Sequence, residues 1–155
     1  MVIFVCWELV FGVRLRSPAI VPGNSHHAVI YAYFHEITRE DVVDMLMELR
    51  EIQPEALPIN FLLPIPGTPL EHADMSVLST AYCMKVLCLA RLLVPKADIR
   101  CAAGREVYFK GEEKKLLSVV DSIFASGYLT EGGQGIEDTL KTITDAGFTY
   151  EIESA

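Results

Sequence analysis

The 155-residue chain is poor in basic residues and contains no cluster of them. Lysine and arginine together number 13, against 21 aspartate and glutamate residues, so the formal net charge at pH 7 is -8. Nucleic acids and anionic membrane surfaces attract proteins through clustered lysine and arginine side chains. We therefore expect neither nucleic acid nor a membrane surface to be a main partner of this chain.

Signals for a membrane anchor or for secretion are also missing. The apolar stretch at residues 1–13 is shorter than the roughly 20 residues that span a bilayer. It lacks the positive leader and the small-residue cleavage site that are typical of a signal peptide. The sequence predicts a cytoplasmic protein.

The four cysteines, at positions 6, 83, 88 and 101, form no CxxC pair and show no zinc-like spacing. Without a secretory context they do not indicate a disulfide framework, and we expect reduced thiols. Cys83 and Cys88 fall on an apolar helical pattern, where cysteine behaves as a small core residue.

What the sequence does contain is enough apolar side chains to fill a core, with 51% hydrophobic and 22% charged residues in a length that suits one domain. Two regions differ in pattern. Residues 1–37 hold an early strand at 2–6 and then an irregular, aperiodic segment at 14–37. Residues 38–155 alternate strands and helices.

The alternating region contains a helix introduced by a capping box at residues 38–41 and ending before Pro54. The further elements that we expect are a strand at 57–63, a helix from Asp74 to just before Pro95, a strand at 98–103, a helix at 112–120, a strand at 122–125 and a helix at 136–146. Their strands are continuous apolar runs, which are typical of a parallel sheet buried on both faces. The predicted fold is α/β, with about four parallel strand–helix units that equal half of a TIM-type barrel.

Two polar residues interrupt the apolar strands. Asn60 lies among Ile, Phe and Leu, where its amide either caps neighbouring backbone or meets a ligand. Arg100 lies among small apolar residues, where an unpaired guanidinium is rarely tolerated. Arg105 and Glu106 follow the second of these strands, and we interpret them as a structural ion pair.

The letters around these residues are specific. They are PINFL (58–62) and PGTPL (66–70) in one strand and turn, IRCAAGRE (99–106) in the next, and SGYLTEGG (126–133) further on. Together they resemble the C-terminal half of biotin synthase, a radical S-adenosylmethionine enzyme. The resemblance implies that Asn60 lies beside the substrate dethiobiotin and that Arg100 is a ligand of a two-iron two-sulfur cluster. It also implies that Leu63 lies near the adenine of S-adenosylmethionine.

Cys6 begins a segment, residues 6–12, that resembles a cluster-cysteine segment of the family without its two middle glycines. Cys6 is therefore either a further ligand of the two-iron cluster or an ordinary buried thiol. The CxxxCxxC loop that holds the four-iron four-sulfur cluster of the family does not occur in the 155 residues. By resemblance the cofactors are S-adenosylmethionine and the two clusters, and we expect this chain alone to bind none of them.

The first hypothesis is a truncated biotin synthase. The parent enzyme would be a sulfurtransferase that inserts sulfur into dethiobiotin to make biotin, whereas these 155 residues alone are expected to be inactive. The alternative is a non-catalytic half-barrel that serves as an assembly or interaction module. Because half a barrel leaves sheet edges open, both hypotheses predict either self-association or pairing with a missing N-terminal half.

Overall fold

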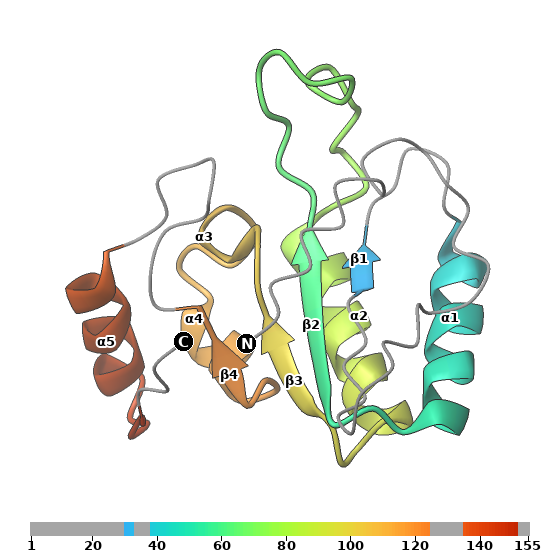
Figure 1. Ribbon diagram of the computed structural model, residues 1–155. Helices are drawn as coiled ribbons and strands as arrows, with labels where there is room; N and C mark the ends of the chain where they lie inside the picture. The colour runs from blue at the N-terminus through green and yellow to red at the C-terminus, as the bar shows by residue number, and fades with distance from the viewer. Residues whose placement is uncertain (1–29, 33–37, 125–134, 152–155) are drawn as a thin grey trace.

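The computed structural model describes residues 30–32, 38–124 and 135–151, and strands and helices alternate along them (Figure 1). The elements in chain order are β1 (Ile30–Ala32), α1 (Arg39–Ile52), β2 (Ala56–Phe61), α2 (Thr80–Leu93), β3 (Asp98–Cys101), α3 (Arg105–Tyr108), α4 (Glu113–Leu117), β4 (Ser122–Ile123) and α5 (Ile136–Asp145). The expected strand at 2–6 and the segment SGYLTEGG lie outside the described residues.

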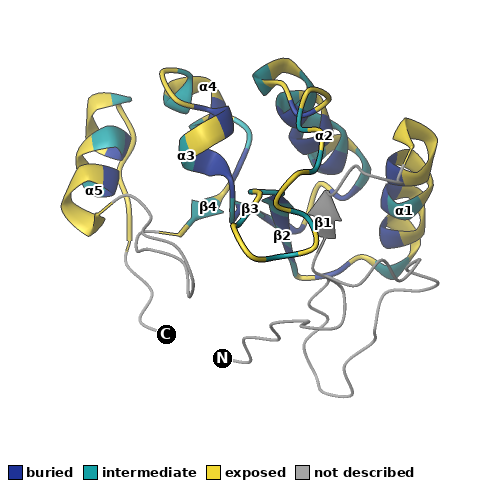
Figure 2. Cartoon of the chain, turned by 90° about the horizontal axis from the view of Figure 1, so that it is seen from above, coloured by how far each residue is buried: buried dark blue, intermediate teal, exposed yellow. Residues whose placement is uncertain are grey.

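The described strands form one parallel sheet in the order β1-β2-β3-β4. Sequential order in a parallel sheet requires each connection to cross over one face, and Figure 2 shows the helices side by side along a single face. The predicted α/β class with parallel strand–helix units is therefore confirmed. One-sided helices are consistent with a partial barrel, and the assignment of these units as half of a TIM-type barrel stays a prediction.

Burial alternates along the two central strands, contrary to the expectation that both faces of the sheet are buried. Every second side chain of β2 and β3 is buried, and those between are only half-buried. Successive strand residues point to opposite faces, and the described helices cover only one of them. The other face, called here the open face, carries Pro58, Asn60, Asp98 and Arg100.

The core lies between the sheet and the helix layer. Its largest fully buried side chains are Phe61, Phe109, Leu46, Leu49, Leu57, Ile59, Leu87, Ile99, Leu116 and Val94. Phe61 at the end of β2 packs against Phe109, with ring centroids 5.8 Å apart, and against Tyr108 at 6.2 Å. The apolar residues predicted for the strands thus form the sheet side of the core.

The start of α1 agrees with its predicted capping box. The Thr38 hydroxyl accepts the N–H of Asp41 at 3.2 Å, and the Asp41 carboxylate accepts the N–H of Thr38 at 2.7 Å. These bonds satisfy amide donors that a helix N-terminus leaves without intrahelical partners.

The start of α2 differs from the predicted one. Asp74 is not its N-cap, because its carboxylate accepts the N–H of Ser76 at 2.9 Å within a turn. Ser79 is the N-cap instead, and its hydroxyl accepts the N–H of Tyr82 at 3.3 Å. An aspartate that bonds backbone two residues ahead stabilises a turn rather than a helix start. The loop between β2 and α2, which projects beyond the end of β2 in Figure 1, is accordingly longer than expected.

Three further boundaries were wrong or missed. β1 lies inside residues 14–37, which the sequence pattern had assigned as irregular. The short helix α3 directly after β3 was not predicted, and α4 spans only part of the expected 112–120 helix. A strand of three residues or a helix of one turn is too short for its hydrophobic periodicity to be recognised in a sequence.

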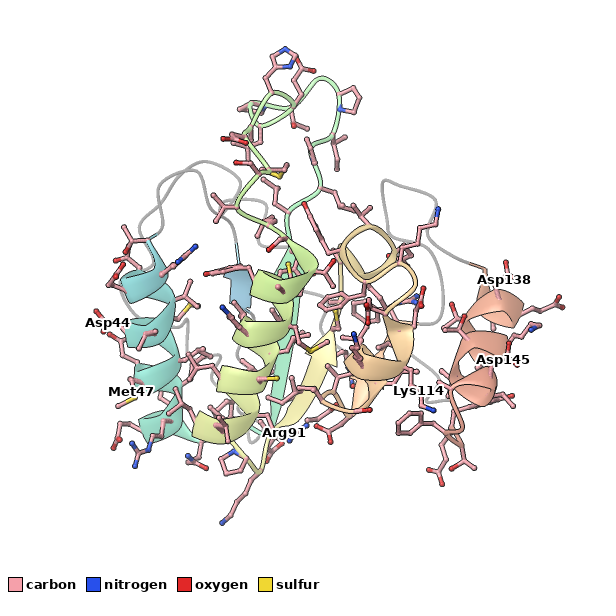
Figure 3. The ribbon with its side chains drawn as sticks, turned by 180° about the vertical axis from the view of Figure 1, so that it is seen from behind. Asp44, Met47, Arg91, Lys114, Asp138 and Asp145 are labelled. Carbon is pink, nitrogen blue, oxygen red and sulfur yellow. The ribbon has the colours of Figure 1, made fainter. Side chains whose placement is uncertain are left out.

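Arg91 ties the end of α2 to the start of β3 and to the turn before β4 (Figure 3). Its guanidinium donates to the carbonyl oxygens of Ala97 and Val119, each at 3.2 Å, and pairs with Asp121. Asp121 in turn accepts the N–H of Ile99 at 2.8 Å. These contacts hold α2 against the amino-terminal ends of the strands. In the described part of the chain, no helix is both long enough and apolar enough to cross a membrane.

Candidate functional site

Asn60 lies near the carboxyl end of β2 on the open face and is half-buried. Its side-chain Oδ1 accepts the backbone N–H of Ala103 at 3.0 Å. This bond extends the β2–β3 pairing past the end of β3, so the amide does cap neighbouring backbone, as one of the two sequence interpretations held. The bond also fixes which end of the amide is oxygen. The Nδ2 end keeps two donors.

Arg100 lies on β3 and is held by two neighbours on the open face. Its Nη2 donates to Asp98 Oδ2 at 2.7 Å, and its Nε donates to Ser122 Oγ at 2.8 Å. The Ser122 hydroxyl donates to Asp98 Oδ1 at 2.7 Å, which closes a ring of hydrogen bonds across β3 and β4. The Phe124 ring lies beside the guanidinium, with its centroid 5.9 Å from Cζ. The expectation that this arginine would have partners is met by a carboxylate and a hydroxyl.

The strand register brings Asn60 and Arg100 to the same face of neighbouring strands. Arg100 pairs with Pro58, and Asn60 lies two positions beyond Pro58 on β2. Two positions along a strand correspond to about 7 Å and return to the same face. The two side chains thus share the open face near the carboxyl ends of the strands. Their roles in binding substrate or cluster stay predictions.

The other two predicted site residues are less well defined by the structure. Leu63 follows the end of β2, is half-buried, and packs against the edge of the core. This contact is what a leucine makes by default, and a contact with adenine stays a prediction. Cys6 lies outside the described residues.

Two buried thiols, those of Cys83 and Cys101, do not fit a cluster at Arg100. Cys101 is next to Arg100 in the strand and is fully buried on the helix side, as alternation predicted. Cys83 is also fully buried, and burial raises the pKa of both thiols to about 12. Within the described ranges, no group of three or more His, Cys, Asp or Glu side chains could hold a metal ion. Cys83 and Cys101 are therefore poor sources of a thiolate for an iron–sulfur cluster at Arg100.

The raised pKa values lead to a testable difference in thiol chemistry. Because the thiolate is the reactive form, Cys83 and Cys101 in the folded chain should react with iodoacetamide at pH 8 at least about 100-fold more slowly than a free thiol. Peptide mass spectrometry after timed labelling would measure each site. Unfolding in urea is the control and should equalise the rates. Fast labelling of Cys101 in the folded chain would mean that its thiol is not buried as described.

Arg105 proves to be more than a surface ion pair. Only 3% of its side chain is exposed, and its Nη2 donates to Glu106 at 2.9 Å and to the Phe124 carbonyl at 3.2 Å. The Thr139 hydroxyl on α5 lies 3.5 Å from the same nitrogen. Arg105 therefore connects α3, the end of β4 and α5, in keeping with the predicted structural role.

Sequence reasoning missed Asp98 and Ser122 as partners of Arg100. The signal for Asp98 was present, because a residue two positions before Arg100 on a strand must share its face. Ser122 could not be found in the same way, since its position opposite Arg100 depends on the register of β3 with β4.

Comparison with known proteins places the sequence that forms this site in a family. The model of the Biotin and Thiamin Synthesis associated domain matches residues 58–149, from β2 to beyond the end of α5. Curated relatives include a protein named biotin synthase 2 from Frankia casuarinae, 43% identical over 112 residues, covering 72% of this chain and 31% of the relative. The biotin synthase of Salinibacter ruber is 44% identical over 110 residues, covering 71% and 30%, respectively. That of Geobacillus thermodenitrificans is 42% identical over 118 residues, covering 76% and 35%.

This chain thus spans about a third of the length of the curated relatives it matches. The match begins within β2 and includes Asn60, Arg100 and their hydrogen-bond partners. With more than half of its residues matched, the chain belongs to the family of the Biotin and Thiamin Synthesis associated domain and is similar to the C-terminal region of biotin synthases.

Proposed function

We propose that this chain is the C-terminal part of a biotin synthase, whose parent reaction inserts sulfur into dethiobiotin by radical S-adenosylmethionine chemistry. The observation that carries the proposal is the placement of Asn60 and Arg100 on one open face of adjacent strands, in a region about 40% identical to biotin synthases. Barrel enzymes build their sites at the carboxyl ends of the strands, where both residues lie.

Asn60 is the residue assigned to the substrate. Its Oδ1 already accepts the Ala103 N–H, so the amide has a fixed orientation, and the two Nδ2 donors are left for a polar group of dethiobiotin. A donor held by an existing bond loses little rotamer freedom on binding. Leu63, at the end of the same strand, would contribute an apolar contact to the adenine of S-adenosylmethionine.

Arg100 is assigned to the two-iron two-sulfur cluster as a single ligand, and Cys6 as a second. The remaining thiolates, and the CxxxCxxC loop with its four-iron cluster, would come from the other part of a complete enzyme. When bound, these groups supply the radical and the inserted sulfur. The 155 residues alone supply the substrate amide and the guanidinium, and they are proposed to bind no cofactor by themselves.

The test combines the chain with an N-terminal part. Given dethiobiotin, S-adenosylmethionine, a reductant, iron and sulfide, the chain alone should form no biotin. Adding an N-terminal part of a biotin synthase that carries a CxxxCxxC loop should restore measurable biotin. Mass spectrometry would quantify the product. Biotin made by the 155 residues without any partner would contradict the proposal.

Site variants in the restored mixture test the residue roles. Asn60→Asp keeps an oxygen that can accept the Ala103 N–H but removes both donors, so biotin formation should fall about 5- to 100-fold. Arg100→Ala should reduce it less, because the guanidinium is one ligand among several. The control is Thr68→Ser, in the turn beyond β2, which keeps the hydroxyl that donates to the Ile65 carbonyl. Equal activity of Asn60→Asp and the unaltered chain would refute the assignment of Asn60.

The second candidate is a non-catalytic half-barrel that serves as an assembly module by self-association. Exposed apolar side chains favour it, among them Leu92 at 76% and Val107 at 59% exposure on the helix layer. It needs no cofactor. A stable oligomer of the chain that forms no biotin in the restored mixture would support this candidate over the first.

A further inference from the structure

The ring of hydrogen bonds on the open face uses both carboxylate oxygens of Asp98. One carboxylate oxygen accepts from Arg100 Nη2 and the other accepts from the Ser122 hydroxyl, each at 2.7 Å. The same hydroxyl accepts from Arg100 Nε at 2.8 Å. Two of the three guanidinium nitrogens are therefore held at fixed directions.

The third nitrogen is left in a defined position. A guanidinium is planar, so fixing Nε and Nη2 also fixes Nη1. In the described part of the chain, no hydrogen-bond acceptor engages Nη1. The ring thus leaves this one nitrogen of the guanidinium for a further acceptor, and the Phe124 ring lies 5.9 Å from the Cζ of the same group.

The ring is better suited to orientation than to stability. The side chains of Arg100 and Asp98 keep 28% and 33% of their surface exposed, and pairs this exposed contribute little to folding. Ser122 alone could not fix the guanidinium, since one hydrogen bond to Nε leaves the group free to tilt. The carboxylate supplies both the second contact and the opposite charge.

We propose that Asp98 is a positioning residue for Arg100, which holds the guanidinium so that Nη1 faces the site. The role of this orientation in the site rests on the proposed function. A cluster or substrate group that binds Arg100 would contact Nη1. Asp98 itself touches neither substrate nor cofactor in this arrangement. The positioning can be measured on the 155-residue chain alone.

The experiment follows the Arg100 Nε–H by nitrogen-15 NMR, with the signal identified by its loss in Arg100→Lys. In the unaltered chain this proton should exchange with water about tenfold more slowly than that of Arg39, which lies exposed on α1. In Asp98→Asn the guanidinium loses its opposite charge, and the amide offers one acceptor where the carboxylate has two, so Arg100 is held more weakly. The exchange rate at Arg100 should then rise about threefold.

The matched control is Asp145→Asn, which removes the same charge from an exposed pair with Lys141 on α5 (Figure 3). It should leave the Arg100 signal unchanged. Ser122→Ala, which keeps the carboxylate but removes the Nε acceptor, should also raise the rate. Melting temperatures should change little in all three variants, so that a role in stability alone would appear as a lower melting temperature with an unaltered signal.

An Arg100 signal that exchanges as fast as Arg39 in the unaltered chain would overturn the proposal without any variant. So would an equal rise in Asp98→Asn and Asp145→Asn. No biotin is formed in this experiment, so its failure leaves the proposed function standing. In turn, a failed biotin assay does not affect the measured orientation of Arg100.

Discussion

Replacing Gly104 with alanine should destabilise the fold by about 3 to 5 kcal/mol, among the largest effects of any single substitution in the described chain. Gly104 follows β3 at φ +89°, a backbone conformation that other residues rarely adopt. A Cβ there would lie 2.6 Å from the Phe61 carbonyl oxygen and 2.8 Å from the Phe61 Cβ. A shift of either atom would disturb the core, because Phe61 is fully buried at the end of β2.

Urea unfolding followed by circular dichroism would measure the loss. The matched control is Gly111→Ala, because Gly111 has nearly the same φ, +81°, but no atom within 4 Å of the added Cβ. It should cost only the backbone strain, about 1 to 2 kcal/mol. The difference between the two variants isolates the contact with Phe61. If both variants lose the same stability, the close approach of Gly104 to Phe61 at the end of β2 is wrong.

The second large effect is expected for Arg105→Ala, with a loss of about 3 to 5 kcal/mol. Arg105 is 3% exposed and donates to the Glu106 carboxylate and to the Phe124 carbonyl. Its removal takes one charged donor away from the Glu106 carboxylate and from the Phe124 carbonyl, and it opens a cavity next to the fully buried Thr139. Because these contacts join α3 to α5, we expect α5 to loosen before the sheet.

Hydrogen exchange by mass spectrometry would show which elements loosen, with the larger gain expected in peptides of α5 than in those of β2. Arg39→Ala is the control, since Arg39 is exposed and loses only a contact of its guanidinium with the Tyr82 ring. That loss should stay below about 1 kcal/mol. Uniform loosening of all elements in Arg105→Ala would argue against a specific link to α5.

The succession of strands and helices could be predicted where each boundary has a local cause. Thr38 and Asp41 cap α1 by direct contact three residues apart, so the sequence contains both partners. The start of α2 could not be predicted in this way, because Asp74 and Ser79 are both residues that cap helices well. Which of them does so depends on where the projecting loop returns to the sheet.

The candidate site was predictable residue by residue but not as an arrangement. Asn60 and Arg100 stand out as polar residues in apolar strands, and strand alternation explains why Cys101 points away. That both side chains share one face follows only from the pairing of Pro58 with Arg100, which neither strand encodes alone. The one-sided helix layer was missed for a similar reason. Apart from Asn60, β2 is apolar, and such a strand reads as buried on both faces even when its half-buried positions face away from the helices.

The ring on the open face also determines which neighbours this part of the chain will accept. A surface that covers Asp98 and Arg100 must supply hydrogen bonds in place of those to water, because desolvation of a charged pair without them costs free energy. An apolar surface of an unrelated protein cannot supply these hydrogen bonds. The open face at β3 and β4 therefore favours partners that supply matching hydrogen bonds. Non-specific aggregation of copies is disfavoured there, even though no described helix covers this face of the sheet.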